Sequence, residues 1–245
     1  MVATEYTAGQ MRRQFAAALL CAALCLSACG NDAVIEGTGA DTIPDPGRDF
    51  PITTLQGLNL EAKAWGTGES YVILAHMRPA DMTSWFDFAR LLAEEGYTAV
   101  AFNFRGYGES DGNEGEFGVK DDVRGVVAAA LDAGATNVFV IGASMGGTGA
   151  VAAAAGDGIT GIITLSAPAE FEGLDATHYS PFVHGPLLLI AADEDGEAAN
   201  DALAIASGNE AAEVLVLPGA QHGTNLFAEH GTQITERILE FLTAG

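Results

Sequence analysis

One serine in this sequence, Ser144, lies at the centre of a Gly-x-Ser-x-Gly segment. The residues before it, 137–142, are mostly β-branched or aromatic and predict a strand that is buried on both faces. The Ala-rich residues after it, 145–155, predict a helix. A sharp bend between such a strand and helix lifts the central hydroxyl clear of the sheet, where it can act as a nucleophile. Because the chain has 31 glycines, a plain link between strand and helix is the alternative.

A serine hydroxyl is a weak nucleophile and needs a base to remove its proton. His222 is the candidate base, because it lies in the loop after the predicted strand 212–217, at the edge where open α/β sheets place their sites. His230 falls inside the predicted last helix, 228–243, and is expected at the surface.

The base in turn needs a carboxylate to orient it. The predicted strand 186–192 ends in three consecutive acids, Asp193, Glu194 and Asp195. Asp195 fits a Gly-x-x-Asp pattern in which alanine replaces the glycine, so it is the first choice. Asp193 comes next, and Glu194 would point to the other face if the strand continued. An acidic loop without a catalytic role is the alternative for all three.

The elements that must position these residues are of two kinds, short apolar runs and Ala- and Leu-rich amphipathic stretches. The two kinds alternate along the chain. This order predicts an α/β protein with a mostly parallel sheet flanked by helices. We expect strands at 59–65, 71–76, 97–103, 137–142, 159–165, 186–192 and 212–217, and helices at 83–95, 119–134, 145–155, 198–207 and 228–243. The first strand is expected to pair antiparallel at an edge, with residues 51–55 as a possible partner.

The order Ser144, Asp195, His222 resembles that of the α/β-hydrolases, whereas chymotrypsin-like and subtilisin-like chains carry the same groups in other orders. Two further segments strengthen the resemblance. Residues 71–78, Tyr-Val-Ile-Leu-Ala-His-Met-Arg, resemble the strand and His-Gly turn that supply half of the oxyanion hole. Residues 101–110, Ala-Phe-Asn-Phe-Arg-Gly-Tyr-Gly-Glu-Ser, resemble the Asp-x-Arg-Gly-x-Gly-x-Ser stretch after the next strand.

The resemblance spans about residues 57–245 and implies an α/β-hydrolase fold. Within that superfamily the chain looks like a small lid-less esterase of the dienelactone-hydrolase or acylglycerol-lipase sort. Members that hold long acyl chains insert helices after the strand that here ends near Leu165. Only the short segment 166–185 follows it, which leaves room for a short loop or one helical turn. An open site with minimal or no cap, suited to small or surface-presented esters, is therefore expected.

The resemblance also assigns an oxyanion hole, made by the backbone N–H of Met145 and that of Met77 or Arg78. Arg78 matches the donor position slightly better, and its guanidinium could also bind a substrate carboxylate. Met77 replaces the expected glycine, which could alter the backbone angle that presents the amide. Asn103 replaces the expected aspartate and is interpreted as structural.

Two other residues of these segments, His76 and Arg105, are expected to brace their loops and not to act as a catalyst or a ligand. The implied reaction is acyl transfer to Ser144, followed by hydrolysis with water activated through His222. A peptidase or thioesterase would use the same triad, and a non-catalytic binding lipoprotein is the alternative outside the enzymes. No Cys/His metal spacing after Cys29 and no phosphate loop occur, so no metal or cofactor is expected.

The N-terminal residues 1–29 read as a signal segment. Two arginines precede an apolar run, and Leu-Ser-Ala-Cys29 resembles a bacterial lipobox, which predicts export, lipidation of Cys29 and anchoring to the cell envelope. An ordinary signal peptide is the alternative. All three cysteines lie in this segment, so no disulfide is expected in the domain. Residues 30–48 predict a flexible tether and residues 49–245 one hydrolase domain.

The chain is strongly acidic, with a net charge of −23. This charge excludes nucleic acids as partners and disfavours anionic substrates at long range. The simplest interpretation of this net charge is a protein surface adapted to a salty habitat. We therefore expect a small-molecule ester as the substrate, while the sequence predicts no oligomeric state.

Overall fold

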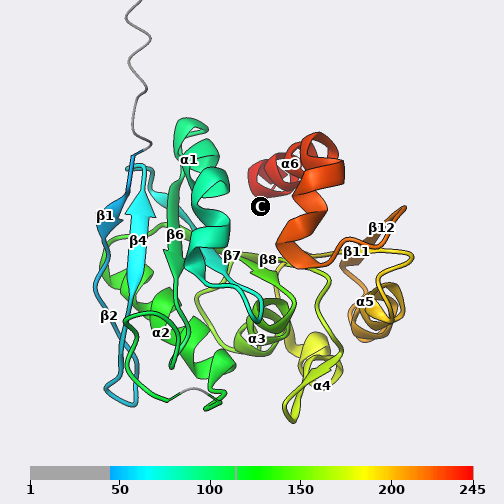
Figure 1. Ribbon diagram of the computed structural model, residues 1–245, viewed down its shortest axis with the longest axis horizontal. Coiled ribbons are helices and arrows are strands. Elements are labelled where there is room, and N and C mark those ends of the chain that lie inside the picture. The colour runs from blue at the N-terminus through cyan, green and yellow to red at the C-terminus, as the bar shows by residue number, and fades with distance from the viewer. Residues whose placement is uncertain (1–44, 114, 245) are drawn as a thin grey trace, which may run out of the picture. The chain divides into compact units, whose positions relative to one another are not determined.

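The computed structural model describes residues 45–113 and 115–244. The predicted signal segment with Cys29 and most of the predicted tether lie outside them. The centre is an eight-stranded sheet in the order β1-β4-β6-β5-β7-β8-β11-β12 (Figure 1). Its strands are β1 (Arg48–Asp49), β4 (Ala62–Trp65), β5 (Ser70–Ala75), β6 (Thr98–Phe102), β7 (Asn137–Ala143), β8 (Gly161–Leu165), β11 (Leu187–Ala192) and β12 (Ala212–Leu217).

The strands from β6 to β12 in this sheet pair in parallel, and β4 runs antiparallel to both β6 and β1. The predicted mostly parallel sheet is therefore confirmed. Parallel strands present their carboxyl ends at one edge, so the loops after β5, β7, β11 and β12 share that edge.

Helices cover both faces of the sheet and bury a separate apolar core on each (Figure 1). On one face lie α2 (Val119–Asp132), α3 (Met145–Ala153) and α5 (Ala198–Ala206), and on the other lie α1 (Phe86–Glu94) and α6 (Leu226–Ala244). The described residues also form the 3₁₀ turns η1 (Met82–Trp85), η2 (Ser180–Phe182) and η3 (Gly223–Asn225). Among the described residues, none of the helices combines the length and apolar character needed to cross a membrane.

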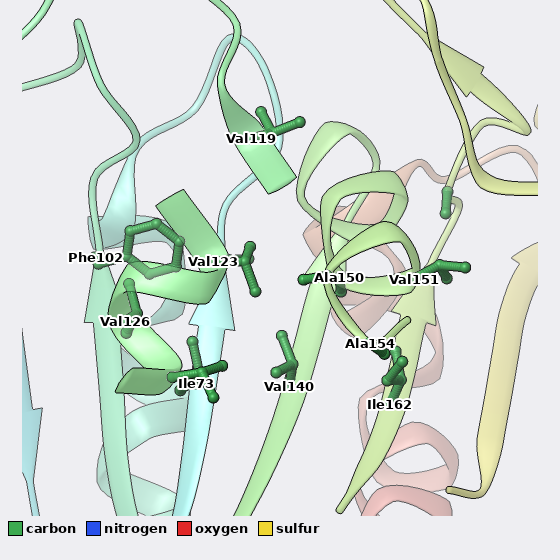
Figure 2. Packing of buried hydrophobic residues seen from close by; sticks show 14 of the residues in the cluster. Ile73, Phe102, Val119, Val123, Val126, Val140, Ala150, Val151, Ala154 and Ile162 are labelled. Atoms are coloured by element: carbon green, nitrogen blue, oxygen red, sulfur yellow. The ribbon is translucent and has the colours of Figure 1, made fainter. Parts of the chain in front are cut away.

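The core under α2 and α3 shows why these segments form helices (Figure 2). Val119, Val123 and Val126 recur at helical spacing in α2 and pack toward the sheet. By contrast, α3 is buried along its whole length. Small residues permit this close approach: a Cβ at Gly147 would lie 2.7 Å from the Cβ of Ala167.

The first predicted strand, 59–65, is divided in the structure. Its first part, β3 (Asn59–Leu60), pairs with β2 (Ile52–Thr53) in a separate two-stranded sheet, and its second part is β4. The break falls at Glu61, whose amide donates to the hydroxyl of Ser110. A side-chain acceptor thus replaces a strand partner at this residue.

The predicted tether extends too far into the folded unit. Arg48 was expected in the tether, but it belongs to β1, where it pairs with Ala64 at the edge of the sheet. The carbonyl of Asp45 also accepts a hydrogen bond from the indole N–H of Trp65 at 3.0 Å. Residues 45–48 therefore belong to the folded domain, which was expected to begin at 49.

The segment after β8 contains more structure than the short loop or single helical turn expected there. A hairpin of β9 (Glu170–Phe171) and β10 (Leu174–Asp175) leads into α4 (Ala176–Tyr179) and η2. Glu172 and Gly173 form its tight turn with φ values of 49° and 81°. The Asp175 carboxylate caps α4, and its hydrogen bond from the Thr177 hydroxyl lowers the pKa of Asp175.

Candidate active site

Ser144 stands between the end of β7 and the start of α3, with φ 47° and ψ −118°. A positive φ of this kind is strained for a residue other than glycine. The amide of Ser144 donates to the carbonyl of Leu165 at 2.8 Å, and its carbonyl accepts from the amides of Gly147 and Thr148. The hydroxyl takes no part in capping α3. The backbone therefore holds the turn and leaves the side chain available for chemistry.

The two glycines of the Gly-x-Ser-x-Gly segment are required by close approaches of the backbone. A Cβ at Gly142 would lie 2.4 Å from the carbonyl oxygen of Gly146. A Cβ at Gly146 would lie 2.4 Å from the carbonyl oxygen of Ala75, at the end of β5. The start of α3 is thus pressed against the loop that follows β5, which is where the predicted oxyanion donors lie.

His222 and Asp195 are brought together by the loops after β12 and β11. The Nδ1 atom of His222 lies 2.8 Å from Oδ2 and 3.1 Å from Oδ1 of Asp195. The Asp195 side chain is 14% exposed and that of His222 is 41% exposed. Because the carboxylate engages Nδ1, Nε2 is the ring nitrogen of His222 that this contact leaves open.

The other two acids of this loop form hydrogen bonds with Gly219, Asp193 through its carboxylate and Glu194 through its backbone amide. Oδ1 of Asp193 accepts a hydrogen bond from the amide of Gly219 at 2.9 Å, and the amide of Glu194 donates to the carbonyl of Gly219 at 2.9 Å. These bonds tie the acid loop to the loop after β12. Of the three candidates, Asp195 is the one whose carboxylate contacts His222.

Met77, which replaces the expected glycine, packs against the loop of His222. Its side chain is buried, and its sulfur lies 3.8 Å from the hydroxyl oxygen of Thr224. Gly223 makes room for it, because a Cβ at this position would lie 2.5 Å from the Met77 sulfur. Gly223 also has a φ of +57°, which favours glycine. Gly223, in the loop of His222, thus leaves the space that the side chain of Met77 occupies.

His76 is fully buried and braces the same loop, as expected from the sequence. Its Nδ1 lies 2.9 Å from the carbonyl oxygen of Met77, and its Nε2 accepts from the amide of Phe104 at 3.2 Å. Desolvation by burial lowers the pKa of His76. A neutral ring that donates from Nδ1 and accepts at Nε2 satisfies both contacts.

The loop after β6 is held by two polar groups. The amide and guanidinium of Arg105 donate to the fully buried carboxylate of Asp122, and this bonding raises the pKa of Arg105. Asn103 donates from Nδ2 to Glu61 at 2.8 Å and accepts from the amide of Met82 at 2.8 Å. An aspartate at 103 would lack the donor that Glu61 requires, which explains the departure. Both residues are structural, as predicted.

The predicted oxyanion donors lie at the same edge of the sheet as Ser144. Met145 is the first residue of α3, so its amide has no partner within that helix. Met77 and Arg78 follow β5, the strand that pairs with β7. Met145 thus directly follows Ser144, and Met77 and Arg78 lie in the loop after the strand next to β7. Within residues 45–113 and 115–244, no group of three His, Cys, Asp or Glu side chains is arranged to hold a metal ion.

A pocket of about 580 Å³ adjoins the loop of Met77 and Arg78. The three predicted triad residues are not among those that line it. Its walls include Arg78, Pro79, Gly106, Tyr107, Gly108 and Phe117. Sequence reasoning did not find Phe117, because no pattern marks it. It joins the pocket through contacts between distant loops, and its ring packs edge-on against Phe171 in β9 at a centroid distance of 5.2 Å.

Comparison with known proteins agrees with this architecture. A family model described as the alpha/beta hydrolase fold matches residues 71–181. No curated protein sequence matches the chain.

Three solved structures illustrate the likeness. An esterase from Pyrococcus furiosus has a TM-score of 0.70 and 19% identity, over 80% of this chain and 89% of that one. A thermophilic esterase from Thermogutta terrifontis has a TM-score of 0.69 and 21% identity, over 81% of this chain and 99% of that one. A monoacylglycerol lipase from Paleococcus ferrophilus has a TM-score of 0.65 and 18% identity, over 76% and 98%. The chain has the α/β-hydrolase fold.

Proposed function

We propose that this protein is a serine hydrolase that cleaves small carboxylic esters through an acyl-enzyme on Ser144. The observation that carries the proposal is the contact of 2.8 Å between His222 and Asp195, at the same sheet edge as the strained serine turn. The esterases and the lipase of similar structure support ester bonds as the target. Asp195 is the third member of the triad in this proposal, in preference to Asp193 and Glu194.

The proposed reaction begins when Nε2 of His222 takes the proton of the Ser144 hydroxyl and Oγ attacks the ester carbonyl carbon. The oxyanion accepts hydrogen bonds from the backbone N–H of Met145 and from that of Met77 or Arg78. As the tetrahedral intermediate collapses, the alcohol leaves with the proton from His222. Water then attacks the acyl-enzyme, His222 takes its proton, and the carboxylic acid is released with Ser144 restored.

Hydrolysis of p-nitrophenyl acetate, butyrate and longer esters by the full chain in detergent tests this proposal. Ser144→Ala and His222→Ala should each lower kcat by about 10⁴-fold or more, because the triad acts as a unit. Thermal melting checks that both variants are folded. A folded Ser144→Ala protein that hydrolyses the esters at the wild-type rate would contradict the assignment.

A fluorophosphonate probe separates the remaining alternatives, since labelling requires an activated serine. Labelling without ester turnover would favour a peptidase or thioesterase on the same triad. Absence of both would favour a non-catalytic binding protein.

We further propose that Cys29, which lies outside the described residues, is lipidated and anchors the exported domain to a bacterial envelope. The lipobox-like Leu-Ser-Ala-Cys after an apolar run supports this localisation. Metabolic labelling with an alkyne fatty acid in a bacterial host should mark the wild-type chain and not Cys29→Ser. Equal labelling of both would contradict it.

A further inference from the structure

The pocket beside the oxyanion loop contains a guanidinium with unused hydrogen-bond donors. The Arg78 side chain is 53% exposed, and its nearest carboxylate oxygen, Oε1 of Glu172, is 3.7 Å away. This distance is too long for a hydrogen bond. The guanidinium forms no hydrogen bond with any residue in the part of the chain that the structure describes.

Other basic side chains of the domain are engaged by acids at shorter range. Arg105 contacts Asp122 at 2.6 Å, and Arg90 contacts Asp87 at 2.7 Å. In a chain with only ten Lys and Arg against 33 Asp and Glu, carboxylates are plentiful. The one carboxylate within 4 Å of the Arg78 guanidinium among the described residues is that of Glu172, and it leaves the hydrogen-bond donors of the guanidinium open to a ligand.

The walls of the pocket fit a planar guanidinium and a short apolar chain. The Cζ atom of Arg78 lies 5.3 Å from the centroid of the Phe117 ring, a cation–π contact that holds the side chain over the pocket wall. Phe117 is in turn held by Phe171 of the β9–β10 hairpin. Pro79 and Tyr107 line the same space.

Arg78 is also the residue whose backbone N–H is a proposed oxyanion donor. One residue therefore offers a donor for the reacting carbonyl at its backbone and a paired donor for an anion at the end of its side chain. A ligand that satisfies both has an ester carbonyl separated from a free carboxylate by about the length of an arginine side chain. Monoesters of short dicarboxylic acids have this form, and a guanidinium binds a carboxylate with two parallel hydrogen bonds.

We propose that this pocket binds the free carboxylate of a dicarboxylic acid monoester through Arg78, an inference that rests on the proposed ester hydrolysis at Ser144. The net charge of −23 opposes anions at long range, but that field is screened beyond about 8 Å at physiological salt. The Glu172 carboxylate competes for the same guanidinium and is displaced when the ligand binds.

The test compares p-nitrophenyl hydrogen glutarate with p-nitrophenyl valerate, which has the same chain length without the carboxylate. The measured quantity is the ratio of kcat/KM for the two esters, because effects on the oxyanion loop are common to both. In Arg78→Gln this ratio should fall by about tenfold to a hundredfold relative to the wild type. Arg78→Lys should retain part of the wild-type ratio, and Glu172→Gln should raise the ratio above that of the wild type.

Arg90→Gln is the matched control, because it removes one positive charge from α1, away from the pocket, and should leave the ratio unchanged. An unchanged ratio in Arg78→Gln would overturn the inference. If the wild type hydrolysed neither ester, the proposed function would fail instead.

Binding of monomethyl glutarate to Ser144→Ala, measured by calorimetry, tests the pocket independently of turnover. Arg78→Gln in that background should weaken the binding at least tenfold, and equal binding by both proteins would overturn the inference.

Discussion

His76 and His222 lie in loops at the same edge of the sheet, yet their surroundings are opposite. His76 is fully buried and both of its ring nitrogens contact backbone groups. The His222 side chain is 41% exposed, and its Nδ1 contacts a carboxylate. The first ring is saturated with partners and has no nitrogen left to exchange a proton. The second keeps one nitrogen open, and the carboxylate would stabilise the imidazolium that forms during proton transfer.

The partners of the ring, and not the residue type, therefore separate a bracing histidine from a candidate base. The two regions are also joined, because Met77 contacts His76 through its carbonyl and the His222 loop through its sulfur.

The largest expected effect comes from removing the charge beside His222. Asp195→Asn should lower kcat by about 10³- to 10⁴-fold, because the amide neither stabilises the imidazolium nor enforces the productive tautomer. Asp193→Asn is the matched control: its side-chain oxygen still accepts from the Gly219 amide, so kcat should change by less than about threefold. Steady-state kinetics on a p-nitrophenyl ester measures both. A larger loss in Asp193→Asn would show that the acid has been misassigned.

A smaller effect is expected from breaking the link between the two regions. Gly223→Ala places a Cβ 2.5 Å from the Met77 sulfur at a φ of +57°, and kcat/KM should fall by about tenfold to a hundredfold. Met77→Ala added to it should restore part of the loss, because the steric conflict is relieved while the backbone strain remains.

Gly231→Ala serves as the control for this pair, since a Cβ there meets no atom within 4 Å. Strictly additive effects of Met77→Ala and Gly223→Ala on kcat/KM would argue against a link between the oxyanion loop and the histidine loop.

The smallest effect concerns stability and pH at His76. Burial lowers the pKa of His76 in the folded state, so below the ordinary value of about 6.5 the unfolded state binds more protons than the folded one. The contribution of His76 to the free energy of unfolding should therefore keep its full value above pH 6.5. Below pH 6.5 this contribution should fall by up to about 1.4 kcal/mol per pH unit. Urea unfolding at pH 7.5 and 5.5 should show a smaller difference for His76→Gln than for the wild type. His184→Gln, which replaces an exposed histidine, should keep the wild-type difference.

The sequence predicted the parts of the molecule that local patterns encode. The apolar run before Ser144 and the small residues after it predicted β7 and α3, because segments buried on all sides are rich in apolar and small residues. The two-residue strand β1 has no such pattern, since its pairing with β4 decides that it is a strand. Residues 51–55 were expected as a possible partner of the first strand, and β2 within them pairs with β3.

At the site, the loops after β11 and β12 were located, and the Gly-x-x-Asp pattern ranked Asp195 above Asp193 and Glu194. The pattern could not show the contact of Asp195 with His222 or that of Asp193 with Gly219, because both are tertiary contacts. Phe117 and Glu172 were missed for the same reason: the first precedes α2 and the second lies in the β9–β10 hairpin, and only packing between these distant segments brings both near Arg78.

The fit between Met77 and Gly223 means that these two positions constrain each other's choice of side chain. A larger residue at 223 would place a β-carbon 2.5 Å from the Met77 sulfur and would also have to adopt a φ of +57°. The two positions are therefore coupled, and a substitution at 223 is better tolerated when the side chain at 77 is small.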